Sequence, residues 1–327
     1  MVEPTNSPRR ETQPSLANHK ANQIDSDQSI AQPLAISDGG VLPKKDDLPT
    51  TLAEILPIAA KISRNRLIYL DRQGKVKTES YLELLEKASK ILTRLRQAGL
   101  QPQDPVILQL EATDELLAAF WGCILGGFVP VILEMATTQP VREKLHHLWT
   151  FLEQPLMISA QSLPYSRILA IDYSVSPTTD YYQPQSDDVA FLNLTSGSTG
   201  IPKCIQLTHQ NIISRAFGAN LHNDHSDDII LNWLPFDHIG SISDWHIRPC
   251  LLGCTAVYVQ KEYILKRPLN WLDLIHQYRV THSWSPNFFY ALLNDQLKNQ
   301  SSQWDLSCVR FLLTAGENIT QNAIQGC

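Results

Sequence analysis

The feature of this sequence that most constrains its fold is the alternation of short apolar runs with longer helical patterns. Strand-like runs lie at 106–110, 128–133, 156–159, 189–192, 229–235, 255–259 and 309–313. Between several of them, as in 81–95 and 271–278, apolar residues recur with the spacing of one helix face. Strands that alternate with helices are typical of a parallel sheet, so the sequence predicts an α/β fold with mainly parallel strands.

The beginning of the chain departs from this alternation. Residues 1–50 contain no aromatic residue and are rich in Pro, Ser, Asn, Gln and Asp, which predicts a disordered leader before a folded region at 51–327. Residues 67–70 and 76–79 are two apolar-alternating runs around a polar turn with Gly, so we expect a β-hairpin. Ser80, with Glu83 three residues later, forms the pattern of a helix-capping box.

Composition excludes several classes of protein. Of 327 residues, 43% are hydrophobic and 18% charged, as in a globular protein with a large core. A net charge of −6 and the lack of a basic stripe argue against a nucleic-acid partner. Six scattered cysteines favour a reducing compartment, hence a cytoplasmic location, and the pair Cys250 and Cys254 lacks a second metal-binding pair.

A membrane span is not expected. The N-terminus lacks the apolar core of a signal peptide. The apolar run 116–133 is long enough to cross a bilayer, but Gly126-Gly127 and Pro130 interrupt it. We therefore predict a buried helix followed by a strand.

A polar loop follows the strand-like run at 189–192. It reads Asn-Leu-Thr-Ser-Gly-Ser-Thr-Gly-Ile-Pro-Lys over 193–203. Small residues leave the backbone amides accessible, and these amides, with hydroxyls and one ammonium group, suit a polyphosphate. The alternative is a flexible polar connector, because Ser, Thr and Gly are ordinary loop residues.

Two further segments stand where strands end, which is where an α/β sheet places ligand-binding groups. The first is Phe-Asp-His-Ile-Gly-Ser at 236–241, in which Asp237 can instead cap a helix and His238 can instead be a core residue. The second is Thr-Ala-Gly-Glu at 314–317, which can equally be an ordinary strand-to-helix turn.

Residues 195–203 closely resemble the phosphate-binding signature of the acyl-adenylate-forming enzymes, the AMP-dependent synthetase/ligase family. They match neither a Walker loop nor a dinucleotide fingerprint. The segments 236–241 and 314–317 resemble two more of the family's motifs, and 81–84 and 121–130 resemble two structural ones. The chain is most similar to fatty acyl-AMP ligases and to loading adenylation domains of polyketide and nonribosomal peptide synthetases. This implies the family's large N-terminal domain, with mainly parallel sheets flanked by helices.

The resemblance implies ATP-dependent activation of a carboxylic acid as acyl-AMP, followed by transfer to a thiol of CoA or of an acyl or peptidyl carrier protein's phosphopantetheine. ATP and Mg²⁺ are the implied cofactors, with Mg²⁺ held mostly by the phosphates. His238, beside the reacting carboxylate, and Lys203, as counter-charge to the phosphates, are the implied catalytic residues. The implied nucleotide-binding residues are Thr195, Ser196, Gly197, Ser198, Thr199, Gly200, Lys203, Gly316 and Glu317. No residue is assigned to a metal.

The class of acid stays open. Members that activate amino acids carry an Asp after an aromatic residue, which Phe236 and Asp237 match. Members that activate fatty acids carry His then Asp, whereas Asp237 here precedes His238. A fatty, aryl, hydroxy or amino acid therefore remains possible.

The family's later elements have no counterpart before Cys327. These are the Tyr-Gly-x-Thr-Glu motif, the ribose-binding Asp and the small C-terminal lid domain with its catalytic Lys. We therefore expect residues 51–327 to be a partial N-terminal domain that is inactive, or nearly so, by itself. The alternative is a naturally short, non-catalytic nucleotide- or acyl-binding protein. The reading frame past codon 327 discriminates between the two.

Overall fold

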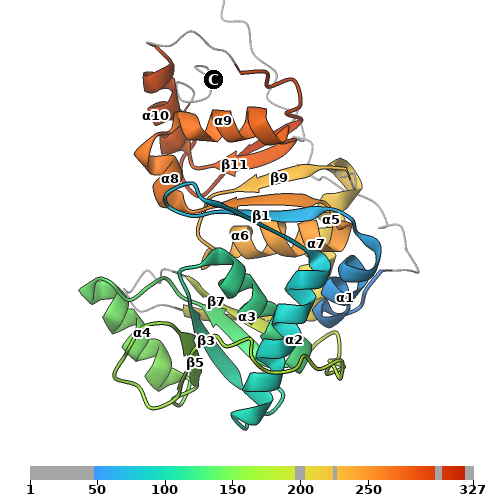
Figure 1. Ribbon diagram of the computed structural model, residues 1–327. Coiled ribbons are helices and arrows are strands. Elements are labelled where there is room, and N and C mark those ends of the chain that lie inside the picture. Colours follow the sequence, from blue (N-terminus) through green and yellow to red (C-terminus); the bar gives the residue numbers. More distant parts are fainter. Residues whose placement is uncertain (1–47, 196–202, 224–226, 299–303, 321–327) are drawn as a thin grey trace, which may run out of the picture. The chain divides into compact units, whose positions relative to one another are not determined.

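The computed structural model describes residues 48–195, 203–223, 227–298 and 304–320 (Figure 1). All of them belong to one compact unit, residues 45–327. The leader expected at 1–50 lies outside the described residues, except for its last three. Within the described residues, the strands form two sheets, which we call sheet A and sheet B.

Sheet A combines strands from the beginning and the end of the described chain. Its strand order is β12 (Phe311–Thr314), β11 (His282–Ser285), β9 (Ile229–Asn232), β10 (Thr255–Val259), β1 (Arg66–Leu70) and β2 (Val76–Ser80). Neighbouring strands are parallel except β1 and β2, which form the predicted hairpin. Leu67 of β1 lies opposite Ala256 of β10, so the hairpin completes a sheet whose other strands come much later in the sequence.

Sheet B is built from the middle of the chain. Its strand order is β6 (Ile168–Leu169), β5 (Leu156–Ser159), β3 (Pro105–Gln109), β4 (Val129–Ile132), β7 (Val189–Thr195) and β8 (Lys203–Thr208). The pairs are parallel except β7 with β8. The sequence-based expectation of mainly parallel strands is confirmed.

Helices connect the strands and cover both sheets. They are α1 (Leu52–Ile62), α2 (Tyr81–Gln97), α3 (Thr113–Gly126), α4 (Gln139–Phe151), α5 (His209–Asn223), α6 (Ile239–Ile242), the π-helical segment η1 (Ser243–Ile247), α7 (Arg248–Leu252), α8 (Lys261–Lys266), α9 (Leu269–Tyr278) and α10 (Asn287–Leu297). At the start of α2 the backbone N–H of Glu83 donates to Ser80 Oγ (3.2 Å), and that of Ser80 donates to Glu83 Oε2 (2.7 Å). The predicted capping box is therefore present.

Inner strands such as β3 and β10 bury both faces, which explains their continuous apolar runs. In β3, Val106 and Leu108 join one hydrophobic cluster with α1, α2 and α3, whereas Ile107 joins another with α4. In β10, Ala256 joins the first cluster and Val257 a third, with α9 and α10. Figure 1 shows α2 and α3 on the side of sheet B that faces sheet A, and α9 and α10 on the far side of sheet A. Side chains that alternate between two apolar faces fix the strand register.

The apolar run 116–133 divides as predicted into α3 and β4. Gly127 ends the helix with a φ of 71°, and a Cβ at this position would lie 2.3 Å from the ring of Tyr182. Glycine is therefore required there on two grounds. Among the described residues, no helix combines the length and the apolar character that crossing a bilayer requires.

Candidate functional site

The polar loop at 196–202 connects two strands that pair with each other. Thr195, the last residue of β7, lies opposite Lys203, the first residue of β8, in antiparallel register. Both ends of the loop are therefore adjacent at one edge of sheet B, and the Lys203 side chain is exposed there. The candidate residues Ser196, Gly197, Ser198, Thr199 and Gly200 lie outside the described residues.

The segment after β9 forms a tight turn that enters α6. His238 is the N-cap of this helix, since its Nδ1 accepts a hydrogen bond from the backbone N–H of Gly240 (3.1 Å). The alternative in which Asp237 caps the helix is wrong, because the cap lies one residue later. His238 is also exposed rather than a core residue, and its ring centre lies 5.6 Å from that of Trp284 in β11.

The segment after β12 is held against the start of α10. Gly316 has a φ of 91°, a conformation that side chains disfavour. Glu317 Oε1 accepts a hydrogen bond from the backbone N–H of Phe288 (2.6 Å). In the described structure Glu317 therefore caps α10, which precedes it in sequence, rather than standing in the first turn of a following helix.

Buried aromatic side chains connect the last two segments. The rings of Trp284 and Trp245 are stacked, with centres 5.7 Å apart and planes 3° apart. Leu313 and Ala315, on either side of the end of β12, pack against the cluster that contains these two rings. The His238 turn and the Gly316 turn are thus adjacent across Trp284.

A small cavity connects the His238 turn to the strand before the polar loop. It has a volume of about 10 Å³, and Asn193 of β7 and Asp237 lie on its wall. The turn at 236–237 and strand β7 therefore meet where strands of both sheets end, at the position that parallel α/β sheets use for ligands. Gly240 lies close to the His238 ring and to Trp284 of β11: a Cβ there would be 3.1 Å from Trp284 and 3.2 Å from His238 Nδ1.

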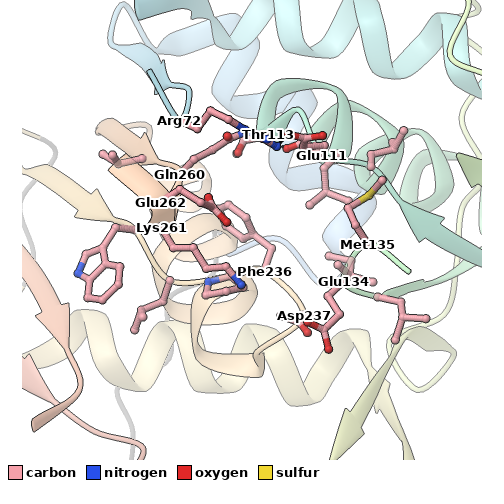
Figure 2. A pocket seen from close by; sticks show the side chains of 18 of the residues that line it. Arg72, Glu111, Thr113, Glu134, Met135, Phe236, Asp237, Gln260, Lys261 and Glu262 are labelled. Carbon is pink, nitrogen blue, oxygen red and sulfur yellow. Dashed lines mark hydrogen bonds and ion pairs between the residues drawn. The ribbon is translucent and has the colours of Figure 1, made fainter. Parts of the chain in front are cut away.

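A larger cavity, of about 410 Å³, opens on the other side of the same turn. Figure 2 shows Phe236 and Asp237 on its wall, with Glu134 near Asp237 and the Lys261 side chain running toward Phe236. Most of the residues that line it lie at or after the carboxyl ends of six strands, β1, β3, β4, β5, β9 and β10. The sequence of any one segment does not indicate that these lining residues share a cavity, although most of them follow an apolar run directly.

One ion pair stands at the rim of this cavity. Arg72, in the turn of the hairpin, pairs with Glu111, which follows β3. Both side chains are about half exposed, 48% and 51%, so water screens their attraction. No local pattern in the sequence indicates this pair, because its two residues belong to different sheets.

The two cysteines with metal-like spacing are Cys250, in α7, and Cys254, after it. Both are buried, and burial raises the pKa of the Cys250 thiol well above its usual range. Nowhere in the part of the chain that the structure describes do three or more His, Cys, Asp or Glu side chains gather as a metal site would need.

Comparison with known proteins assigns a family. The family model described as "AMP-binding enzyme" matches residues 58–326. The nonribosomal peptide synthetase acyN of Ascocoryne sarcoides is 29% identical over 293 residues, which are 81% of this chain and 32% of that protein. The nonribosomal peptide synthetase btyA of Aspergillus terreus is 30% identical over 275 residues, 76% of this chain and 29% of that one.

Solved structures agree. The adenylation domain of a keto acid-selecting nonribosomal peptide synthetase module, bound to keto acyl adenylate, has a TM-score of 0.81 at 32% identity, covering 86% of this chain and 56% of that one. The fatty acid AMP ligase from Legionella pneumophila has a TM-score of 0.75 at 25% identity, covering 88% and 53%. The chain spans about a third of these curated relatives and about half of these solved chains. It belongs to the AMP-binding enzyme family, whose homologues here are peptide synthetase adenylation domains and fatty acyl-AMP ligases.

Proposed function

We propose that this chain supplies the N-terminal part of an enzyme that activates a carboxylic acid as its acyl-adenylate. The observation that carries the proposal is the position of the turn at 236–238: Phe236 and Asp237 line both cavities, where strands of both sheets end, and His238 contacts Trp284 of the aromatic cluster. Segments far apart in sequence are brought to one edge, as a site for two substrates requires. The family match supports the same reaction.

In the proposed reaction a carboxylate oxygen attacks the α-phosphorus of ATP. A bond between the carboxylate oxygen and phosphorus forms, the bond to the bridging oxygen breaks, and pyrophosphate leaves. Like charges repel as the two anions approach, so positioning and charge neutralisation make up most of the catalysis. Lys203 and the loop that begins at Thr195 would hold the terminal phosphates, and His238 would lie beside the carboxylate.

The described residues fit ATP in their chemistry. Lys203 is exposed at the loop's end, and no described carboxylate forms an ion pair with it. Its ammonium group is therefore available to a phosphate. We propose that Mg²⁺ enters with the nucleotide and takes most of its ligands from the phosphates, because this small, hard ion prefers oxygen ligands.

For the acid, we propose a 2-oxo or aryl acid without an α-ammonium group. Asp237 lines both cavities and could hold an α-ammonium group, so an amino acid is the alternative that the test below must exclude. A relative that selects keto acids is among the similar structures.

We propose a carrier-protein thiol as the acceptor, in keeping with the peptide synthetases among the relatives. We place the reaction in the cytoplasm, and assign residues 51–327 to the N-terminal domain of this fold. The whole reaction belongs to a protein of the relatives' length.

The test is binding of a non-hydrolysable acyl-adenylate analogue to the purified 327-residue chain, measured by calorimetry. Phenylpyruvyl, phenylalanyl and fatty acyl sulfamoyl adenosines are compared, with sulfamoyl adenosine alone as the control for the nucleotide. We expect the phenylpyruvyl analogue to bind at least tenfold more tightly than the phenylalanyl one. Equal binding of all three would refute the acid class, and no binding of any would refute the proposed function. Acid-dependent ATP–pyrophosphate exchange by this chain would contradict the expectation that it is inactive alone.

A further inference from the structure

A buried histidine lies behind the His238 turn. His246 is in the π-helical segment η1, and its side chain is 0% exposed. Single π-helical turns interrupt the regular helical ladder and recur at functional sites. Here the interruption stands between α6, which His238 caps, and α7.

The hydrogen bonds of His246 determine which of its nitrogens carries the proton. The indole N–H of Trp121, in α3, can only donate, and it lies 2.8 Å from His246 Nε2. Nε2 is therefore the acceptor, and the neutral ring must carry its proton on Nδ1. From there it donates to Tyr258 Oη in β10, at 2.7 Å. Cys250 Sγ lies 3.9 Å from Nε2. Burial keeps this thiol protonated, so no thiolate is present that would draw the ring proton to Nε2.

The ring stays neutral over the whole physiological range. Burial lowers the pKa of His246 to about 3, because water cannot solvate the charged imidazolium. Burial likewise raises the pKa of Tyr258 well above its usual range. The arrangement is therefore a fixed chain of neutral hydrogen bonds from α3 through η1 to β10.

The hydrogen-bonded residues His246 and Tyr258 contact the turn that carries His238. The ring of Phe236 meets His246 edge-on at 6.0 Å and Tyr258 edge-on at 5.5 Å between centres. Phe236 is buried, and it lies two residues before His238. Fixing the plane of its ring fixes the backbone that leads into the turn.

The start of the turn is held by Asn232 of β9, the strand that pairs with β10. Tyr258 pairs with Asn232 in the sheet register. Asn232 bonds both backbone groups of Leu234: its Oδ1 accepts from the N–H at 3.2 Å, and its Nδ2 donates to the oxygen at 3.2 Å. Its Oδ1 also accepts from Trp284 Nε1 at 2.7 Å. Asn232 thus connects the turn to Trp284, the ring that His238 contacts.

We propose that His246 is a positioning residue, which in its Nδ1–H tautomer holds Phe236, and through it His238, in place for adenylation. The inference rests on the proposed function for its purpose but not for its geometry. In this proposal His246 is buried and touches no substrate, but it orients His238, which lies beside the substrate. Loss of this tautomer is expected to move the His238 ring relative to Trp284.

The tautomer can be observed directly in the full chain by NMR with ¹⁵N-labelled histidine. We expect one neutral histidine with a proton on Nδ1 that does not titrate above pH 5, and that disappears in His246→Asn. In Trp121→Phe the donor to Nε2 is gone, so we expect the proton to move to Nε2 in part of the molecules, because Tyr258 can then donate to Nδ1. Tyr258→Phe keeps the Trp121 donor and should keep the Nδ1–H tautomer.

The positioning role is read from the His238 ring resonances and from acyl-adenylate analogue binding. We expect His246→Leu and Trp121→Phe to shift the His238 resonances and to weaken analogue binding roughly tenfold, with sulfamoyl adenosine binding unchanged. His246→Gln, which keeps an acceptor near Nε2, should restore part of the affinity. The matched control is His209→Asn, a buried histidine whose Nδ1 accepts from Leu52 N–H at 3.0 Å away from the turn. It should lower the melting temperature and leave both readouts unchanged.

Two outcomes would overturn the proposal. One is a wild-type His246 that is charged, or protonated on Nε2, at neutral pH. The other is His238 resonances that stay unchanged in folded His246→Leu and Trp121→Phe. If these resonances shift but the wild-type chain binds no acyl-adenylate analogue, the proposed function fails and the positioning stands.

Discussion

The carboxylate of Glu317 accepts a hydrogen bond from the backbone N–H of Phe288 at 2.6 Å, and so ties the end of β12 to the first turn of α10. A residue that resembles a nucleotide-site carboxylate thus also has a structural role in the described chain. The two roles predict different effects of removing the charge and removing the acceptor.

Glu317→Gln should keep the hydrogen bond and lose the charge. We expect the melting temperature to stay close to that of the wild type, while nucleotide binding weakens if the charge serves the site. Glu317→Ala removes the acceptor as well, which should cost about 1 kcal/mol of unfolding free energy, as for other lost helix caps. Chemical denaturation and calorimetric ATP titration separate the two. Equal stability of Gln and Ala variants would contradict the capping role.

Lys203→Met should weaken ATP binding roughly 10- to 100-fold, because a hydrogen bond to a charged phosphate contributes about 1.5–3 kcal/mol. The melting temperature should not change, since the Lys203 side chain is exposed. Lys61→Met, at an exposed position in the last turn of α1, is the matched control and should bind ATP like the wild type. Unchanged ATP affinity in the Lys203 variant would remove this residue from the site.

Gly240→Ala tests the space beside His238. The added Cβ would lie 3.1 Å from Trp284 and 3.2 Å from His238 Nδ1, so one of the two rings has to move. We expect weaker binding of aryl acyl-adenylate analogues and a small change in stability. Gly218→Ala, where nothing lies within 4 Å of the added Cβ, is the control. Identical analogue affinities of the two variants would show that the acid binds elsewhere.

A buried ion pair beneath the hairpin should contribute strongly to stability. Lys87 Nζ lies 2.5 Å from Glu79 Oε2 and 3.3 Å from Asp114 Oδ2, and Glu79 is 2% exposed. Lys87→Met leaves the buried Glu79 without a cation, while Asp114 keeps Lys77, and this loss should cost about 3–5 kcal/mol. Lys90→Met, on the same helix with a more exposed partner, Glu86, should cost less than about 1 kcal/mol. Denaturant unfolding measures both free energies of unfolding. Similar decreases in the two variants would show that burial of the Lys87 ion pair does not raise the cost of breaking it.

Stability should fall in acid through two histidines. Burial lowers the pKa of His246 to about 3 and that of His209 to about 4. Unfolded histidine binds a proton below about pH 6.5, while the folded rings stay neutral, so stability is complete above that pH. At pH 5 each histidine should cost roughly 2 kcal/mol relative to pH 7.5. The loss continues until the pH reaches each folded pKa. A melting temperature that is equal at pH 7.5 and pH 5 would contradict this.

The local features of the fold could be predicted, and the non-local ones could not. The hairpin, the Ser80 capping box and the division of 116–133 depend on neighbouring residues, and the structure confirms all three. The position of β1 beside β10 depends on residues far apart, and no pattern within either strand indicates it. The short helix α8 was not predicted, because six residues carry too little periodicity.

The candidate site divides in the same way. Its motifs could be found because each is a contiguous segment at a strand end. The cap at His238 rather than Asp237 differs by one residue, which is the usual uncertainty of helix boundaries. The contacts of His246 with Trp121, Tyr258 and Phe236 join η1 to α3, to β10 and to the turn after β9, so composition and spacing carry no sign of them.

The insertion of sheet B between the two halves of sheet A has a consequence for synthesis on the ribosome. Ser63 donates a hydrogen bond to the backbone oxygen of Gly253, 190 residues later, at the border of β1 and β10. At 5–20 residues per second, β1 waits roughly 10–40 s for its neighbour. Sheet B, made entirely from residues 105–208, is complete before then. We therefore expect it to form first, and the nascent hairpin to be the segment that most needs a chaperone.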